Sequence, residues 1–205
     1  MDATLTTVLI VLAVLVVLAV VGLLVGRKRK SKKLQEQFGP EYDRTVTDSG
    51  KKRDAERELK QRSERRKELD IQPLDPKRRD AFAAEWRETQ EAFVDMPAEA
   101  VSDANALVER VMQERGYPTE DFDQMSRDVS VDHANVVQEY RSAHEISLLN
   151  DRKEATTEQL RRAMVHYRSL FADLLDAGEH DRRGTDAPYP DEDRVQQRDG
   201  EHGRR

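Results

Sequence analysis

The feature that most constrains this chain is an apolar run close to its N-terminus. The eighteen residues from Val8 to Val25 contain no charged or polar side chain. At about 1.5 Å of rise per residue, a helix over residues 5–26 spans roughly 30 Å, the thickness of the hydrocarbon core of a bilayer. A lone segment in lipid must satisfy its own backbone hydrogen bonds, which a helix does. The sequence therefore predicts a transmembrane helix over residues 5–26.

The order of charges around this run favours a retained anchor over a cleaved secretory signal. A signal peptide carries its bases before the apolar run and a small-residue cleavage site after it. Here Asp2 precedes the run, and six bases follow it: Arg27, Lys28, Arg29, Lys30, Lys32 and Lys33. By the positive-inside rule, the N-terminus faces outward and the rest of the chain faces the cytoplasm. We therefore expect a single-pass protein of the cell membrane, with these bases as its topology signal and its contact with the membrane surface.

Two glycines near the end of the run have the G-x-x-x-G spacing that lets two membrane helices approach closely. Gly22 lies inside the predicted span and Gly26 lies at its edge. Glycine is also frequent in membrane helices in general. The pair is therefore a candidate contact for a weak homodimer, and ordinary membrane composition remains the alternative.

The distribution of charge divides the rest of the chain into a basic neck and an acidic body. Residues 27–33 carry six bases and no acid, and residues 51–69 carry nine bases against five acids. Residues 70–177 carry thirteen bases against twenty-three acids, a net charge of −10. Nucleic-acid affinity comes chiefly from neutralising phosphates, so an acidic body argues against a nucleic-acid partner. The chain has no cysteine, which excludes disulfides, thiolate metal sites and a cysteine nucleophile.

The neck, residues 27–69, is expected to contain a break followed by a charged helix. Gly39 and Pro40 interrupt any helix that continues out of the membrane. Residues 51–69 are rich in Glu, Lys and Arg, with favourable i,i+4 pairs such as Glu58 with Arg62. Apolar residues are few in this segment, so it lacks a stripe to pack on a partner. We therefore expect a solvated, fraying helix that acts as a spacer.

Residues 70–177 show the apolar spacing of five amphipathic helices and no strand-like alternation. The expected starts are Asp75 as an N-cap, Pro97, Thr119, Asp132 as a second N-cap, and Thr156 in a capping box with Gln159. The last helix is expected to end before Gly178, and residues 178–205 read as a disordered tail because they are almost free of apolar side chains. The predicted fold is all-α: one transmembrane helix, a charged juxtamembrane helix, a small five-helix domain and a tail.

Three segments carry a resemblance to a known family: FGPEYDRTV (38–46), LDIQPLDP (69–76) and MVHYRSLF (164–171). They resemble landmarks of a family of membrane-anchored or secreted helical proteins of actinobacteria. The resemblance covers most of residues 34–177 and implies a bacterial source. That family has no assigned activity, so the resemblance implies no catalytic or binding residue.

The body contains no motif of a known chemistry. Its histidines lack the spacing that places two metal ligands on one helix face, and its serines lack the glycine-framed turn of a nucleophile elbow. We expect His144 at the edge of the core with a hydrogen-bond partner, His133 beside a helix cap, and His166 exposed. Phe82 and Trp86 are expected in the core. No catalytic, cofactor-binding or metal-binding residue is therefore predicted, and the chain is not expected to be an enzyme.

A tethered helical module without catalytic motifs is typical of a protein-interaction function. A tether raises the effective concentration of a weak binder near its target, and an acidic surface attracts basic partners. We therefore expect an adaptor, scaffold or regulatory module with an unknown protein partner. Two alternatives stay open: a small-ligand sensor or enzyme with a site between helices, and an extracytoplasmic envelope protein if the topology is inverted.

Overall fold

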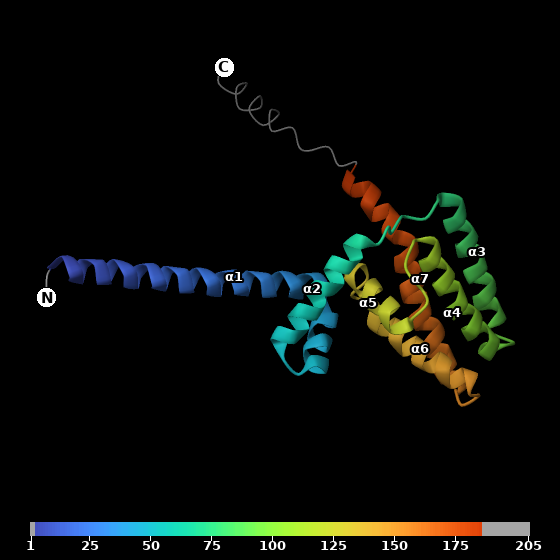
Figure 1. Ribbon diagram of the computed structural model, residues 1–205. Coiled ribbons are helices and arrows are strands. Elements are labelled where there is room, and N and C mark those ends of the chain that lie inside the picture. Colours follow the sequence, from blue (N-terminus) through green and yellow to red (C-terminus); the bar gives the residue numbers. More distant parts are fainter. Residues whose placement is uncertain (1–2, 186–205) are drawn as a thin grey trace, which may run out of the picture.

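The computed structural model describes residues 3–185, with side chains throughout 28–176 and at a few earlier positions. These residues form seven helices and no strand, which confirms the all-α prediction. The helices are α1 (Ala3–Ser49), α2 (Lys52–Glu68), α3 (Pro76–Ala92), α4 (Pro97–Glu114), α5 (Phe122–Asp132), α6 (Val137–Asp151) and α7 (Thr157–Thr185). Figure 1 shows α1 as a long rod that leaves one side of a bundle formed by the other helices.

The predicted break at Gly39 and Pro40 is a kink inside α1. Gly39 has φ 46° and ψ −123°, a conformation that only glycine adopts readily, and it separates two helical segments. Pro40 follows as the first residue of the second segment, where its missing N–H costs nothing. The kink places residues 40–49 as a short arm that runs beside α2 (Figure 1).

The predicted membrane span is part of α1, but most side chains of residues 5–26 are not described. Within the part of the chain that the structure describes, no helix is both long and apolar enough to cross a membrane. The span over residues 5–26 stays a prediction from the sequence.

The expectation that the charged helix of the neck is a solvated spacer is wrong. Ala55 and Leu59 on α2 are fully buried, and Leu59 packs with Phe38 and Tyr42 of α1 in a small second core. Arg62 lies on the same face, because residues four and then three positions apart are neighbours on a helix. These three residues are enough to bury one face of α2, because α1 and α5 supply carboxylates that pair with its arginines. Val131 of α5 also packs against this second core, so contacts cross the boundary predicted at residue 69.

The main core lies among α3, α4, α6 and α7. The Trp86 ring stacks on Phe171 with 4.7 Å between ring centroids, and Phe82 is also buried, which confirms both as core residues. Tyr140 and Tyr167 are fully buried at the centre. The Tyr167 hydroxyl donates to Asn105 Oδ1 at 2.8 Å, so its polar end is satisfied inside the core.

Two of the predicted helix starts differ from the structure. The cap of α5 is Asp121, whose carboxylate accepts a backbone N–H of the first turn at 2.6 Å. Asp132 is the last residue of α5 and not the cap of the next helix, which begins at Val137 without a side-chain cap. The predicted capping box before α7 is confirmed: Thr156 N donates to Gln159 Oε1 at 2.8 Å, and Gln159 N donates to Thr156 Oγ1 at 3.3 Å.

The last helix continues past the predicted end at Gly178. Helix α7 runs to Thr185, so the first eight residues of the predicted tail are helical. A glycine in a helix interior costs only about 1 kcal/mol relative to alanine, and the residues from 179 to 183 contain no proline. Residues 186–205, the rest of the predicted tail, lie outside the described residues.

Candidate functional site

A buried carboxylate marks the place where the arm of α1 meets the body. Glu41 lies two residues after the kink, and its side chain is 0 % exposed. The kink turns the helix so that this side chain points at α2 and α6 instead of solvent. A buried charge is costly unless it is paired, so its partners decide whether the arm stays in place.

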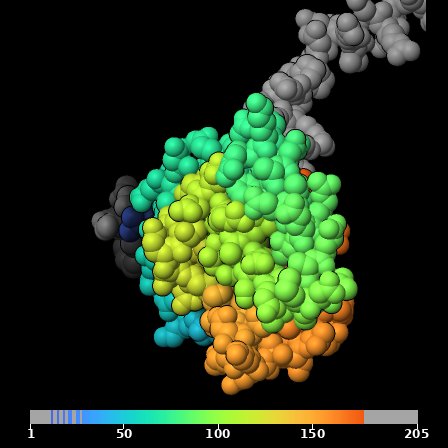
Figure 2. Space-filling view, turned by 90° about the vertical axis from the view of Figure 1, so that its right-hand side faces the viewer, coloured from blue at the N-terminus to red at the C-terminus, as the bar shows by residue number. Residues whose placement is uncertain are grey.

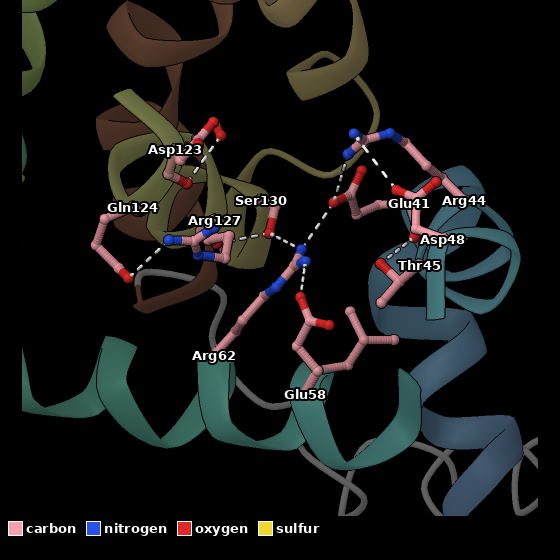
Figure 3. A network of polar contacts seen from close by, with 12 residues as sticks. Glu41, Arg44, Thr45, Asp48, Glu58, Arg62, Asp123, Gln124, Arg127 and Ser130 are labelled. Atoms are coloured by element: carbon pink, nitrogen blue, oxygen red, sulfur yellow. Dashed lines mark hydrogen bonds and ion pairs between the residues drawn. The ribbon is translucent and has the colours of Figure 1, made fainter. Parts of the chain in front are cut away.

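Two arginines from distant elements hold this carboxylate, and Figure 3 shows one of them, Arg62. Arg141 on α6 donates from Nη1 to Glu41 Oε2 at 2.6 Å and from Nη2 to Oε1 at 2.9 Å, a two-point pair. Arg62 on α2 donates from Nη1 to Glu41 Oε1 at 2.7 Å and to Ser130 Oγ at 3.2 Å. Its Nη2 forms a short contact with Glu58 Oε1. One carboxylate therefore joins α1, α2 and α6, and Arg62 extends the junction to α5.

The ionisation of Glu41 follows from these contacts. Burial alone raises the pKa of Glu41, but the hydrogen bonds and positive charges of Arg141 and Arg62 outweigh it and hold the pKa below its ordinary value of 4.5. Arg44, one turn along α1, adds a longer ion pair of 3.6 Å. The carboxylate is therefore ionised at neutral pH, although it has no access to solvent.

Further ion pairs bind α2 to α5 along the same face. Arg65 Nε donates to both oxygens of Asp128, at 3.0 and 3.2 Å, and the Asp128 side chain is 0 % exposed. Arg66 contacts Asp132, which also accepts the hydroxyl of Tyr117 at 2.9 Å. Burial and the nearby Asp132 carboxylate raise the pKa of Tyr117, so this hydroxyl stays protonated and donates. The basic α2 thus neutralises acids of the body that the charge map assigned to a separate unit.

A cleft opens beside this network, between α2 and α5. It has a volume of about 520 Å³ and is lined by Glu58, Gln61, Arg62, Arg65, Gln124 and Arg127. Arg127 Nη2 donates to Gln124 Oε1 at 3.3 Å, and Gln124 Nε2 donates to Asp128 Oδ1 at 2.9 Å. Arg127 has no ion pair with any described carboxylate. The cleft therefore presents positive charge in a body that is acidic overall.

A second hollow lies at the far end of the body from α1. It has a volume of about 420 Å³ and lies between the start of α4, the end of α6 and the turn before α7. Asn150 donates to Ala98 O at 2.8 Å and so joins the two turns that flank it. Figure 2 looks at this side of the body, where the orange α6–α7 turn lies below the green α3 and α4. Three exposed apolar side chains belong to this end: Val94, Met96 and Leu148.

The residues predicted at the membrane surface lie on the rod of α1, outside the bundle. Lys28, Arg29, Lys30, Lys32 and Lys33 are exposed, and the side chain of Arg27 is not described. Lys32 forms an ion pair of 3.4 Å with Glu36. An added Cβ at Gly22 or Gly26 meets no described atom within 4 Å, so the chain itself does not use the space at either glycine. The structure holds a single chain, and the helix–dimer contact stays a prediction.

The surroundings of the three histidines differ from those expected from the sequence. His133 caps the end of α5, is buried, and places Nδ1 2.5 Å from Asp173 Oδ2, whereas we expected only a neighbouring cap. His144 lies flat on Phe122, with 3.5 Å between centroids, and its Nδ1 has no hydrogen-bond partner among the described residues, so the expected partner is wrong. Burial lowers the pKa of His144, because it disfavours the charged ring. His166 is half-buried, not exposed.

Sequence reasoning missed the network around Glu41. Glu58 with Arg62 was identified only as an exposed helix pair, and Arg141 was not singled out. One signal was available: Ala55, Leu59 and Arg62 share a helix face. Arg62 on that face meets Glu41 and Ser130, 21 and 68 positions away, and Glu41 in turn meets Arg141, 100 positions away; no local pattern identifies these partners.

Within the described residues, no group of three acidic or histidine side chains is arranged to hold a metal ion. No family model matches the chain, and neither a curated protein nor a solved structure is significantly similar to it.

Proposed function

We propose that this chain is a single-pass membrane protein that presents a non-catalytic helical interaction module to the cytoplasm. The observation that carries the proposal is the course of α1. One helix contains the apolar run and the six bases, and its last segment is held in the body by the buried pair of Glu41 with Arg141. A module joined to its anchor in this way keeps a fixed orientation to the membrane instead of swinging on a flexible linker.

The end of the body opposite α1 is the surface we assign to a protein partner. Val94 is 82 % exposed and Met96 is 53 % exposed in the turn between α3 and α4, and Leu148 is exposed nearby on α6. Glu91 and Asp95 are exposed next to this turn in the chain, and Glu99 and Asp151 line the adjacent hollow together with one base, Lys153. Exposed apolar side chains with a mostly acidic rim favour a partner of opposite charge. We therefore propose a partner segment that carries apolar and basic side chains.

Topology is tested by two reporters fused in turn to the C-terminus of the full chain, one active only in the cytoplasm and one active only outside it. We expect activity from the cytoplasmic reporter alone, because the bases follow the apolar run. Activity from the outer reporter alone would instead support an extracytoplasmic envelope protein. Replacing the six bases with glutamine is expected to reduce the fraction of correctly oriented chains.

The partner surface is tested by crosslinking the full-length protein in its native cells. We expect a protein with a basic, apolar segment to be captured by the wild type and lost in the double variant Val94→Ser, Met96→Ser. The matched control is Val165→Ser, since Val165 is also about half exposed but lies on α7 outside this surface. Equal capture by both variants would remove the assignment of this surface.

A small-ligand sensor is the second candidate, and the cleft between α2 and α5 is the observation that favours it. The cleft lies between helices, is polar, and has a volume within the range of small-molecule sites. Binding there would bridge a helix of the neck and a helix of the body. A ligand that binds only one arrangement of these helices shifts the population toward that arrangement.

A further inference from the structure

We propose that the cleft between α2 and α5 binds the phosphate group of a small soluble ligand. The proposal deepens the second candidate function and does not depend on the protein partner. The volume of the cleft, about 520 Å³, accommodates a phosphorylated molecule of the size of a metabolite. The cleft suits such a ligand in its charge, its unused hydrogen-bond donors and its rigid walls.

The charge of the lining favours an anion. Arg62, Arg65 and Arg127 face the cleft with Glu58 as the one carboxylate among its lining residues. Glu41 and Asp128, outside the lining, pair with Arg62 and Arg65, so Arg127 supplies the positive charge that no described carboxylate balances. The whole chain has a net charge of −6, so the cleft is a local exception. The planar guanidinium groups of arginine match two oxygens of a phosphate, which a single ammonium group does not.

Two of these arginines retain donors that the protein does not use. Arg62 Nε is buried and has no hydrogen-bond partner among the described residues, although Nη1 and Nη2 of the same guanidinium both have acceptors. Buried donors in proteins are nearly always paired, so this one points to a missing acceptor. Arg127 donates only to the neutral Gln124, by a long bond of 3.3 Å, and forms no ion pair with a described carboxylate. Its positive charge is therefore free to bind an anion.

The walls of the cleft are held in place before any ligand enters. Gln124 is fixed between Arg127 and Asp128, and Asp128 is fixed by both contacts to Arg65 Nε. Arg62 is fixed by Glu41, as Figure 3 shows. Donors that are ordered in advance lose little conformational freedom on binding, which raises affinity. The network that joins neck to body thus also preorganises the cleft.

The distance from the membrane favours a soluble ligand over a lipid headgroup. If the membrane ends near Gly26, the helix from there to Phe38 rises about 18 Å before the kink. Headgroups extend only about 5–8 Å beyond the hydrocarbon core. Figure 1 shows α2 and α5 at the end of the α1 rod that is remote from residue 3, so a phosphate in bulk solution has readier access to the cleft than one in a lipid.

The test uses the full chain in nanodiscs of phosphatidylcholine, titrated with inorganic pyrophosphate by calorimetry at constant ionic strength. We expect saturable binding at one site, and a loss of affinity of about tenfold or more in Arg127→Gln, because one charged donor is removed. Gln61→Glu, which adds a negative charge at an exposed position on the lining, is expected to abolish binding. Arg168→Gln is the matched control, since Arg168 is exposed on α7 and has no ion pair with a described residue.

Four outcomes would overturn the proposal. Absence of saturable pyrophosphate binding removes it, and so does an equal loss of affinity in Arg127→Gln and Arg168→Gln. Binding of citrate as tight as that of pyrophosphate would show general anion attraction without a phosphate site. A fourth arm replaces part of the phosphatidylcholine with phosphatidic acid. Arg127-dependent binding to that lipid, without binding of pyrophosphate in solution, would assign the site to a headgroup and reject the soluble ligand. The crosslinking and reporter results do not change with any of these outcomes.

Discussion

Glu41 and Arg141 lie one hundred positions apart in the sequence, and their side chains form a two-point ion pair inside the protein. Both are almost completely buried, with 0 % and 10 % of their side chains exposed. A buried pair of this kind contributes less through its own attraction than through the penalty for leaving either charge unpaired. The arm of α1 is therefore held in one arrangement on the body, because other arrangements strand a buried charge.

The first prediction concerns the loss of this carboxylate. Glu41→Gln is expected to lower the free energy of unfolding by about 3–5 kcal/mol, because Arg141 remains buried without a counter-charge and Arg62 keeps only the half-exposed Glu58 as a partner. The measurement is urea unfolding of the full chain in detergent. The fluorescence of Trp86 reports the transition, since it is the only tryptophan in the chain and stacks on Phe171 in the main core.

The control for this prediction is Glu36→Gln on the same helix. Glu36 forms an exposed i,i+4 pair with Lys32, so its loss is expected to cost at most about 0.5 kcal/mol. A cost for Glu41→Gln as small as that of Glu36→Gln would mean that the buried network does not hold the fold.

The second prediction concerns acid unfolding. The pKa of Glu41 is lowered in the folded protein relative to 4.5, since the two arginines outweigh the effect of burial. Between the lowered value and 4.5 the unfolded chain binds more protons than the folded chain, so stability rises with pH in this window. The contribution of Glu41 is fully present above pH 4.5 and is lost as the pH falls through the folded pKa.

The pH dependence in this window is measured as the difference in stability between the wild type and Glu41→Gln. The urea midpoints of the wild type and of Glu41→Gln are compared from about pH 6 down to about pH 3. We expect the gap between them to narrow below pH 4.5, because the variant has no carboxylate to protonate at this position. A gap that stays constant over the whole range would contradict the lowered pKa.

The third prediction tests whether α2 packs on the arm of α1. Leu59→Ala is expected to destabilise the protein by about 2–5 kcal/mol, because Leu59 is fully buried against Phe38 and Tyr42. A solvated spacer helix would instead tolerate alanine, which has the higher helix propensity. Amide hydrogen exchange in residues 34–68 is the local readout. Unchanged protection in Leu59→Ala would restore the spacer interpretation.

Local signals predicted much of this fold, and they did so where the relevant partners are close in sequence. The capping box of Thr156 with Gln159 involves residues three positions apart, and the break at Gly39 depends on one residue and the proline that follows it. The core role of Trp86 followed from its spacing to Phe82 on one helix face. Such features are fixed by short segments, so periodicity and capping rules identify them.

The candidate site was not predictable in the same way. Residues 51–69 are almost without apolar side chains, and periodicity rules read such a segment as solvated. Its burial depends on acids of α5 and on Glu41, whose positions are set by the kink and by the packing of the whole body. Arg65 with Asp128 spans sixty-three residues. Long-range ion pairs leave no periodic trace, so the charge map separated neck from body where the structure joins them.

The last prediction concerns the connection between α2 and α3, which passes over the end of α4. Gly116 has φ 96°, and a Cβ added there would lie 2.4 Å from the carbonyl oxygen of Asp70, a backbone atom that cannot move alone. Gln72 N donates to Arg115 O at 2.8 Å beside it, so the segment is fixed on both sides of the contact. Gly116→Ala is therefore expected to destabilise the protein by about 3 kcal/mol, from backbone strain together with a forced shift of this segment.

Gly50→Ala is the matched control, because Gly50 also has a positive φ, of 64°, but nothing lies within 4 Å of an added Cβ. Gly50→Ala introduces the backbone strain without the clash, so it is expected to destabilise the protein by about 1 kcal/mol. The two thermal midpoints, measured on the full chain, separate these contributions. Equal midpoints would mean that residues 70–72 are not held against α4, and that neck and body are joined through the ion pairs of α2 alone.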